Sequence, residues 1–292
     1  MYCFVPKVCD GSNGSILEIK GVDFLMNINS MAILGLLSPL VGALVARFAN
    51  CQPKIAQVVT ILGVFISWLA ALALFRDAAW IGMPIDLYQF SWIEAFGYQL
   101  EIGFWLDALS LMMMVIITTV SLLVHIYSVG YMQGEDNLGA YFSYVSFFTF
   151  AMLILVMSNN LLQVFMGWEG VGVASYLLIG FWQKKPYPAA ASIKAFIVNR
   201  IGDMGLVIAT GLIFSQLGDV SYGDILNQGG QLLAQASYGL RWIDWICLGL
   251  LVAAMGKSAQ MPLQVWLPDS MAGPTPISAL IHAATWSQLV FT

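Results

Sequence analysis

Long apolar runs separated by short polar connections set the pattern of this chain. Each run is close to the length of about 20 residues that a helix needs to cross a bilayer. The eight apolar segments are residues 31–48, 55–76, 104–129, 141–158, 160–182, 190–217, 243–260 and 275–292. This pattern predicts an all-α fold, a polytopic bundle of about eight transmembrane helices, without a separate soluble domain.

The polar stretches between the runs predict a few further elements. Residues 1–30 form a polar leader that differs in character from the apolar runs after it. The loop 77–103 contains an alternating stretch from Leu87 to Trp92, which is typical of a strand or hairpin outside the membrane. Residues 219–241 form a polar loop, in which we expect a surface helix around Tyr222–Ala236.

The seventh segment is predicted to be broken. Four prolines follow Lys257, namely Pro262, Pro268, Pro274 and Pro276. Proline removes a backbone donor and clashes with the preceding turn, so it ends or kinks a helix. Irregular backbone at membrane depth is tolerated where it lines a cavity. We therefore expect the helix to break just beyond Lys257.

Composition narrows the class of protein. The chain is 60% hydrophobic and 9% charged, whereas a soluble domain is typically about 25% charged. It has no basic patch of the kind that nucleic-acid binding requires. The four cysteines are scattered and show neither a metal-ligand spacing nor a disulfide framework. Gly170-Val-Gly172 lies inside an apolar run rather than after a strand, so it is no dinucleotide fingerprint. Electron chemistry is therefore not expected in this chain.

The basic residues outside the apolar runs predict an orientation, because they are enriched on the cytoplasmic side of membrane proteins. If the N-terminus is external, four of them fall on the cytoplasmic side: Arg47, Lys54, Lys184 and Lys185. Arg76 and Arg241 fall outside, together with those of the leader. The bias favours an external N-terminus.

A short set of ionisable residues remains within the apolar runs. It consists of Asp107, His125, Glu169, Lys194, Arg200, Asp203, Lys257 and His282. A charged group at the centre of a membrane helix costs about 2.5–3.5 kcal/mol on insertion scales. These groups are therefore expected to face one another or a hydrated cavity.

Glu169 and Lys257 are the strongest candidates for a role in ion movement. Glu169 stands in Gly-Trp-Glu-Gly-Val-Gly, near the middle of an apolar run, and acids at that depth usually mark ion pathways. The alternative is a static, paired carboxylate. Lys257 lies deep in its segment, where burial and a nearby carboxylate would let a lysine gain and lose a proton near neutrality. The alternative is a lysine that snorkels from a helix end.

Three charged residues share the sixth segment. Arg200 and Asp203 are three positions apart and so lie on one face of a helix; they form either a local ion pair or part of a relay. Lys194 is nine positions before Asp203, which places it on the opposite face. It faces a different cavity or reaches toward the cytoplasmic interface.

Three ionisable candidates remain. His282 comes after Pro274 and Pro276, where a neutral imidazole could shuttle protons; a hydrogen-bonded structural histidine is the alternative. His125 precedes the polar turn YSVGYMQGEDN and is interpreted as interfacial and structural. Asp107 is interpreted as an acid at a helix start, favoured by the helix dipole.

Four motifs resemble one family. They are FWLDALSLMMM, GWEGVGVASYLLIGFW, KAFIVNRIGD and GKSAQMPLQVWLPDSMAGPTPISALIHAAT. They are similar to the largest antiporter-like subunit of the proton-pumping NADH:quinone oxidoreductase, respiratory complex I, which is called subunit L in bacteria. The likeness runs from about residue 31 to Thr285. It places two transmembrane helices and an external loop in 31–103, a proton-translocating antiporter-like domain in 104–285 and a tail in 286–292.

The resemblance implies roles for the charged residues. Glu169 and Lys257 would form an ion pair in the proton channel, and His282 would pass protons onward. Arg200 and Asp203 would tune Glu169 or couple to the neighbouring subunit, with Lys194 as a further channel residue. Separating Glu169 from Lys257 would release the lysine proton.

The resemblance also implies the setting of the chain. It would bind no cofactor itself, since NADH, FMN, iron–sulfur clusters and quinone belong to other subunits of the complex. Its partners would be the other membrane-arm subunits, above all the adjacent antiporter-like subunit, together with the lipid bilayer. Its location would be the inner (cytoplasmic) membrane.

Two departures from the family pattern lead to further expectations. The first departure is at the C-terminal side: family members are roughly twice as long, and the tail TWSQLVFT is what a one-base deletion would produce from the usual continuation. The second is the polar leader: Lys20-Gly21-Val22 can be encoded by a sequence that resembles a ribosome-binding site, so translation is expected to begin at Met26 or Met31. Two alternatives stay open: an Mrp-type cation/proton antiporter or membrane-hydrogenase subunit, and a non-functional remnant. The Gly-Val-Gly after Glu169 and the Ala after His282 favour complex I over the Mrp homologue.

Overall fold

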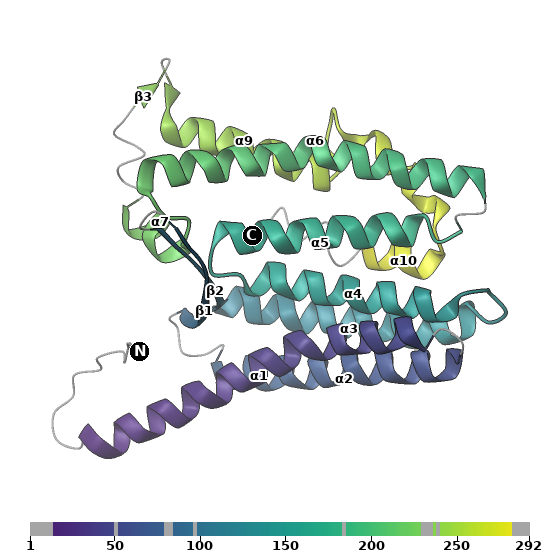
Figure 1. Cartoon of the computed structure of the whole chain (residues 1–292), viewed down its shortest axis with the longest axis horizontal. Helices are drawn as coiled ribbons and strands as arrows, with labels where there is room; N and C mark the ends of the chain where they lie inside the picture. Colours follow the sequence, from purple (N-terminus) through teal and green to yellow (C-terminus); the bar gives the residue numbers. More distant parts are fainter. Residues whose placement is uncertain are drawn as a thin grey trace.

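The computed structural model describes residues 14–49, 52–78, 84–95, 98–182, 185–228, 236–237 and 240–281. Within these ranges, six helices are long and apolar enough to cross a membrane. They are α1 (Gly14–Phe48), α2 (Pro53–Ala78), α3 (Ala108–Tyr131), α4 (Leu138–Met157), α5 (Leu161–Ile179) and α6 (Pro186–Leu217). They lie roughly side by side in one bundle, and the protein is a multi-pass helical membrane protein (Figure 1).

The first helix begins earlier than the apolar pattern predicted. α1 starts at Gly14, and the part apolar enough to span a membrane is Phe24–Phe48, whereas the prediction began at residue 31. The predicted polar leader is thus helical from Gly14 onward. The polar residues in this stretch did not stop the helix, because it holds no proline between Gly14 and residue 31.

A β-hairpin lies between α2 and α3, as the alternating pattern predicted. β1 (Ile85–Ala95) pairs antiparallel with β2 (Tyr98–Leu106). The predicted third helix was too long at its start, because residues 104–106 belong to β2. α3 begins after Asp107, whose carboxylate accepts from the backbone N–H of Ser110 at 2.7 Å while Ser110 completes the capping box. The interpretation of Asp107 as a helix-start acid is confirmed.

The hairpin is fastened to the start of α5 by amide side chains. Asn160 caps α5 by accepting from the N–H of Gln163 at 2.8 Å, and its amide donates to the carbonyl of Glu101 at 2.6 Å. The Gln163 side chain exchanges hydrogen bonds with the backbone of Gly103 at 3.0 and 3.2 Å. These contacts gather the hairpin, the end of α4 and the start of α5 at one end of the bundle (Figure 1).

The sixth and seventh segments pack against each other through glycine residues. α9 (Trp242–Lys257) runs antiparallel along α6 (Figure 1). A Cβ at Gly202 would lie 2.8 Å from the Cα of Gly256, and a Cβ at Gly205 only 2.4 Å from the carbonyl oxygen of Gly249. Small residues let membrane helices approach this closely. The backbones of α6 and α9 are therefore in direct contact along this seam.

The break after Lys257 is confirmed. α9 ends at Lys257, and the chain continues through two 3₁₀ turns, η1 (Gln264–Trp266) and η2 (Asp269–Ala272), into the short helix α10 (Thr275–Ala279). With 16 residues, α9 is shorter than the predicted span 243–260. The rest of the predicted eighth segment lies outside the described residues, as do His282 and the tail 286–292.

The loop after α6 differs from the prediction in detail. The surface helix is α7 (Tyr222–Gln228), which is shorter than the predicted Tyr222–Ala236. Ala236 belongs instead to β3 (Ala236–Ser237), which pairs with β4 (Leu240–Arg241) directly before α9. Val220 and Ser221 connect this loop to the start of α5, so that it adjoins the hairpin end of the bundle.

Candidate functional site

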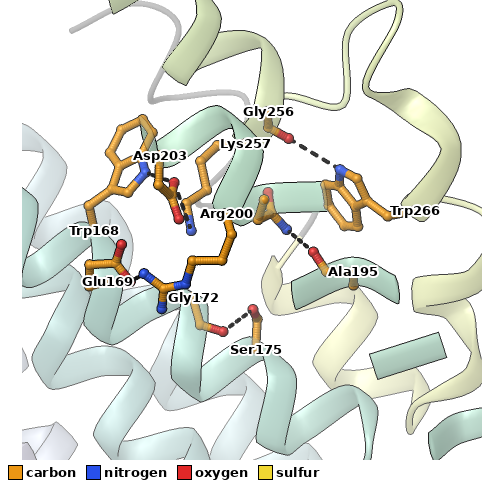
Figure 2. Close-up of polar contacts among 11 residues, drawn as sticks. Trp168, Glu169, Gly172, Ser175, Ala195, Arg200, Asp203, Gly256, Lys257 and Trp266 are labelled. Carbon is orange, nitrogen blue, oxygen red and sulfur yellow. Dashed lines mark hydrogen bonds and ion pairs between the residues drawn. The ribbon is translucent and has the colours of Figure 1, made fainter. Parts of the chain in front are cut away.

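Four charged side chains from three helices meet inside the bundle. Glu169 comes from α5, Arg200 and Asp203 from α6, and Lys257 from the last position of α9 (Figure 2). The glycine seam explains why α6 and α9 contribute together, because Gly202 and Gly256 touch and Asp203 and Lys257 are the next residues in sequence. The prediction that charges within the apolar runs face one another is confirmed for these four.

Glu169 forms an ion pair with Arg200. The contact joins Glu169 Oε2 to the Arg200 guanidinium, and both side chains are partly buried. The guanidinium also lies over the ring of Phe196, 4.6 Å from its centroid. The second carboxylate oxygen, Oε1, is buried and has no hydrogen-bond partner within the described part of the chain. Only one oxygen of this carboxylate is therefore used in the ion pair.

Asp203 lies deeper than Glu169 and is bound by Trp168. The indole N–H of Trp168 donates to Asp203 Oδ1 at 2.5 Å, and the same oxygen is 4.0 Å from Lys257 Nζ. Lys257 is 1% exposed, and the residues that the structure describes provide no hydrogen-bond partner for its ammonium. Nζ also lies 5.7 Å from the centre of the Trp168 ring. The ammonium is therefore buried and paired only at a distance.

Two expected pairings differ from those in the structure. Of the two alternatives for Arg200 and Asp203, the local ion pair is not formed, because Arg200 turns to Glu169 on α5 while Asp203 turns to Trp168 and Lys257. The implied contact between Glu169 and Lys257 is likewise replaced, within the described residues, by Glu169–Arg200 and Lys257–Asp203. The spacing of three positions from Arg200 to Asp203 permitted a pair on one helix but did not require it. Arg200 instead pairs with Glu169 on α5, and Asp203 pairs with Lys257 on α9.

The broken segment after α9 is fixed at this site. Trp266 of η1 donates its indole N–H to the carbonyl of Gly256 at 3.1 Å (Figure 2). Gly172 of α5 also leaves room for the lysine, because a Cβ there would lie 3.0 Å from Lys257 Nζ. The position of the ammonium is thus set by both the end of its helix and the absence of a side chain opposite.

Lys194 lies apart from the cluster, as its position on the other face of α6 predicted. Its ammonium donates to Asp269 of η2 at 2.6 Å, and this hydrogen bond lowers the pKa of the Asp269 carboxyl. Sequence reasoning missed Asp269 as a partner. The available signal was an acid between two prolines of a broken apolar segment.

His125 is buried rather than interfacial. It lies within α3, is fully buried, and its Nδ1 is 2.8 Å from the carbonyl oxygen of Ser121. Its ring packs against Phe142 of α4. The interfacial placement is therefore wrong, because the polar turn begins only after α3 has continued to Tyr131. Its hydrogen bond and close packing agree with a structural role.

An apolar cavity of about 590 Å³ adjoins the charged cluster. Trp168 lines it, so the indole separates the cavity from Asp203. Its other walls come mainly from apolar residues of five helices, α3 to α6 and α9. The two carboxylates and two cations of the cluster therefore lie beside Trp168, next to this apolar cavity.

The fold and site define a class: polytopic helical membrane proteins with a buried set of acids and bases at a broken helix. Two family models match the chain. One is described as NADH-ubiquinone oxidoreductase (complex I), chain 5 N-terminus, over residues 92–142. The other is described as NADH:quinone oxidoreductase/Mrp antiporter, over residues 158–291. The chain belongs to the NADH-quinone oxidoreductase subunit L and chain 5 family.

Curated relatives give the degree of similarity. NADH-quinone oxidoreductase subunit L of Neisseria meningitidis is 46% identical over 270 residues, covering 89% of this chain and 40% of the relative. NADH-ubiquinone oxidoreductase chain 5 of Chondrus crispus is 42% identical over 263 residues, covering 87% and 39%. The chain therefore spans about two fifths of the length of these relatives.

Two solved structures share the fold. The Mrp complex from Dietzia sp. DQ12-45-1b matches with a TM-score of 0.68 and 24% identity, covering 92% of this chain and 27% of that one. The membrane-bound sulfane sulfur reductase, an archaeal respiratory membrane complex, matches with a TM-score of 0.72 and 20% identity, covering 89% and 39%. At this identity the likeness concerns the fold alone.

Proposed function

We propose that this chain is a proton-translocating membrane subunit of an NADH:quinone oxidoreductase. In this proposal, other subunits oxidise NADH and reduce quinone, and this chain moves protons across the membrane. The observation that carries the proposal is the cluster of Glu169, Arg200, Asp203 and Lys257 inside the helix bundle. Charges at that depth are costly and usually mark ion pathways.

The cluster supports a proton transfer that is controlled by electrostatics. Glu169 and Asp203 are the acids that act on Lys257, and Arg200 is the competing cation. Two unit charges 4 Å apart interact by on the order of 4 kcal/mol at an effective dielectric constant of 20. One pKa unit corresponds to about 1.4 kcal/mol. A change of partner at Asp203, whose Oδ1 is 4.0 Å from Lys257 Nζ, is therefore large enough to move a proton on or off Lys257.

The proposed setting is that of the relatives. The partners are the other membrane-arm subunits, including an adjacent antiporter-like subunit, and the redox cofactors belong to other chains. The location is the inner membrane, with the N-terminus outside. A proton released by Lys257 would continue toward His282. Relatives named as oxidoreductase subunits, at 41–46% identity, support this choice over an Mrp-type antiporter.

The test measures NADH-driven proton uptake. Glu169→Gln is introduced into the gene of the host organism, and inverted membrane vesicles are energised with NADH while a fluorescent dye reports acidification. We expect a loss of at least about tenfold in the rate of proton uptake. Glu135→Gln is the matched control, because Glu135 is an exposed acid in the turn between α3 and α4. Normal uptake by Glu169→Gln, or no NADH-driven uptake by the unsubstituted protein, would contradict the proposal.

A further inference from the structure

Trp168 occupies the oxygen of Asp203 that lies nearest to Lys257. An indole has a single N–H and is a donor only. In Trp168 this donor is used on Asp203 Oδ1 at 2.5 Å. Lys257 Nζ is 4.0 Å from the same atom, which is beyond the 2.7–3.2 Å of an N–H···O hydrogen bond. The carboxylate is therefore hydrogen-bonded to the tryptophan, whereas its contact with the lysine is an ion pair without a direct hydrogen bond (Figure 2).

The surroundings keep this arrangement in place. Trp168 is 6% exposed and Asp203 is 4% exposed. The far side of the indole faces the apolar cavity, where Leu206 of α6 and Ala253 of α9 are among the lining residues. The charged groups that act on Lys257 are Asp203 and Arg200 from α6 and Glu169 from α5. Of these acids, Asp203 is the one whose oxygen lies within 4.0 Å of the lysine, and that oxygen is the one bonded to Trp168.

We propose that Trp168 is a positioning residue, whose indole N–H holds Asp203 short of Lys257 and so keeps the lysine able to release its proton. Without the N–H, the carboxylate is free to turn to the ammonium. A direct hydrogen bond to a charged partner would then favour the protonated lysine. The part of the proposal that concerns proton release rests on the proposed function, whereas the hydrogen bond itself does not.

The hydrogen bond is tested without any assay of translocation. The chain is labelled with ¹⁵N-tryptophan and studied in lipid bilayers by solid-state NMR, and the Trp168 indole resonance is assigned by its loss in Trp168→Phe. We expect this resonance to move upfield in Asp203→Asn, because a neutral amide oxygen is a weaker acceptor than a carboxylate. The other nine indole resonances report whether the fold is kept. An unmoved Trp168 resonance in a folded Asp203→Asn variant would overturn the proposal.

Proton release is tested by the pH profile of NADH-driven uptake. Trp168→Phe keeps an aromatic ring but loses the N–H, and we expect the pH of half-maximal uptake to move by about one unit to the alkaline side. Trp182→Phe is the matched control, since its indole N–H donates at 3.1 Å to Glu135, outside the cluster. An unshifted profile for Trp168→Phe would refute the positioning role while leaving the proposed function intact. Absence of uptake by the unsubstituted protein would refute both the proposed function and the role of Trp168 in proton release. The NMR experiment would still test the hydrogen bond between Trp168 and Asp203.

Discussion

At the scale of single residues, the site depends on glycine residues as much as on charged side chains. Gly172 faces the end of the Lys257 side chain, and a methyl group there would stand 3.0 Å from Nζ. Such a contact is tighter than usual, so the ammonium would have to shift by a few tenths of an ångström. Gly172, the last glycine of Gly-Trp-Glu-Gly-Val-Gly, therefore helps to fix the position of the ammonium. Trp168 and Glu169 of the same motif supply polar groups of the site.

We predict that Gly172→Ala lowers proton uptake without unfolding the helix. The new methyl group displaces the ammonium from Asp203, and the expected loss is about tenfold, or about 1.4 kcal/mol in the barrier. The measurement is NADH-driven uptake in membrane vesicles. Gly211→Ala on α6 is the matched control, because a Cβ there meets nothing within 4 Å and alanine is the better helix former. Equal uptake by the two variants would contradict this account of Gly172.

At the scale of elements, helix ends and helix crossings place the cluster. The start of α3 is fixed by a local capping box at Asp107, and the start of α5 by Asn160. The crossing of α6 and α9 depends instead on Gly202 and Gly256, which are far apart in sequence and touch through their backbones. Capping side chains thus set where these helices begin, whereas glycines set how closely two helices pack against each other.

We predict that Gly202→Leu forces α6 and α9 apart. A Cβ at this position would lie 2.8 Å from the backbone of Gly256, so the larger side chain cannot be accommodated without a shift. Overpacking of this kind costs about 1–3 kcal/mol, which would appear as a lower midpoint of thermal unfolding in detergent. Gly211→Leu changes the same helix on an open face and should leave the midpoint near that of the unsubstituted protein. Equal midpoints for the two variants would refute the importance of the crossing.

The N-cap of α3 leads to a second prediction at this scale. Asp107→Ala removes the acceptor for the N–H of Ser110 and should lower the free energy of unfolding by about 1 kcal/mol. Asp107→Asn keeps an acceptor oxygen and should stay close to the unsubstituted protein. The free energy of unfolding of the two variants and of the unsubstituted protein is compared by circular dichroism. A stable Asp107→Ala variant would mean that the capping box contributes little to this helix.

At the scale of the whole molecule, the two ends of the bundle differ in character. The hairpin, α7 and the β3–β4 pair lie at one end (Figure 1). The turns between α1 and α2, α3 and α4, and α5 and α6 lie at the other end. Arg47, Lys54 and Lys185 are beside these turns. Because basic residues are enriched on the cytoplasmic side, the hairpin end is expected to face outward.

The orientation is tested by labelling from one side. Phe90 of the hairpin and Glu135 of the α3–α4 turn are both exposed and lie at opposite ends. In a background with the four native cysteines replaced by serine, we predict that Phe90→Cys reacts with a membrane-impermeant maleimide in intact spheroplasts. Glu135→Cys should react only in inverted vesicles. The reverse pattern would overturn the predicted orientation.

The sequence by itself determined the elements of this protein. Apolar length predicted the membrane helices, alternation predicted the hairpin, Asp107 marked the start of α3, and prolines marked the break after Lys257. These features depend on residues that are close together in the chain, so their physical causes can be read directly. The same reasoning also found the charged residues of the cluster, because each is costly in an apolar run. It erred at element ends, as at Gly14 and after Gln228, where the preferences of neighbouring residues are weak.

Only the tertiary structure decided which charges pair. Arg200 was equally able to bond Asp203 on its own helix or Glu169 on α5, and the choice depended on how the two helices are rotated toward each other. The bond from Trp168 to Asp203 depends on how α5 packs against α6, and the 4.0 Å gap to Lys257 depends on the closeness of α6 and α9 at Gly202 and Gly256. Rotation and separation of helices arise from all their packed side chains together. For this reason the sequence identified the members of the site, whereas the packing of the helices determined their partners.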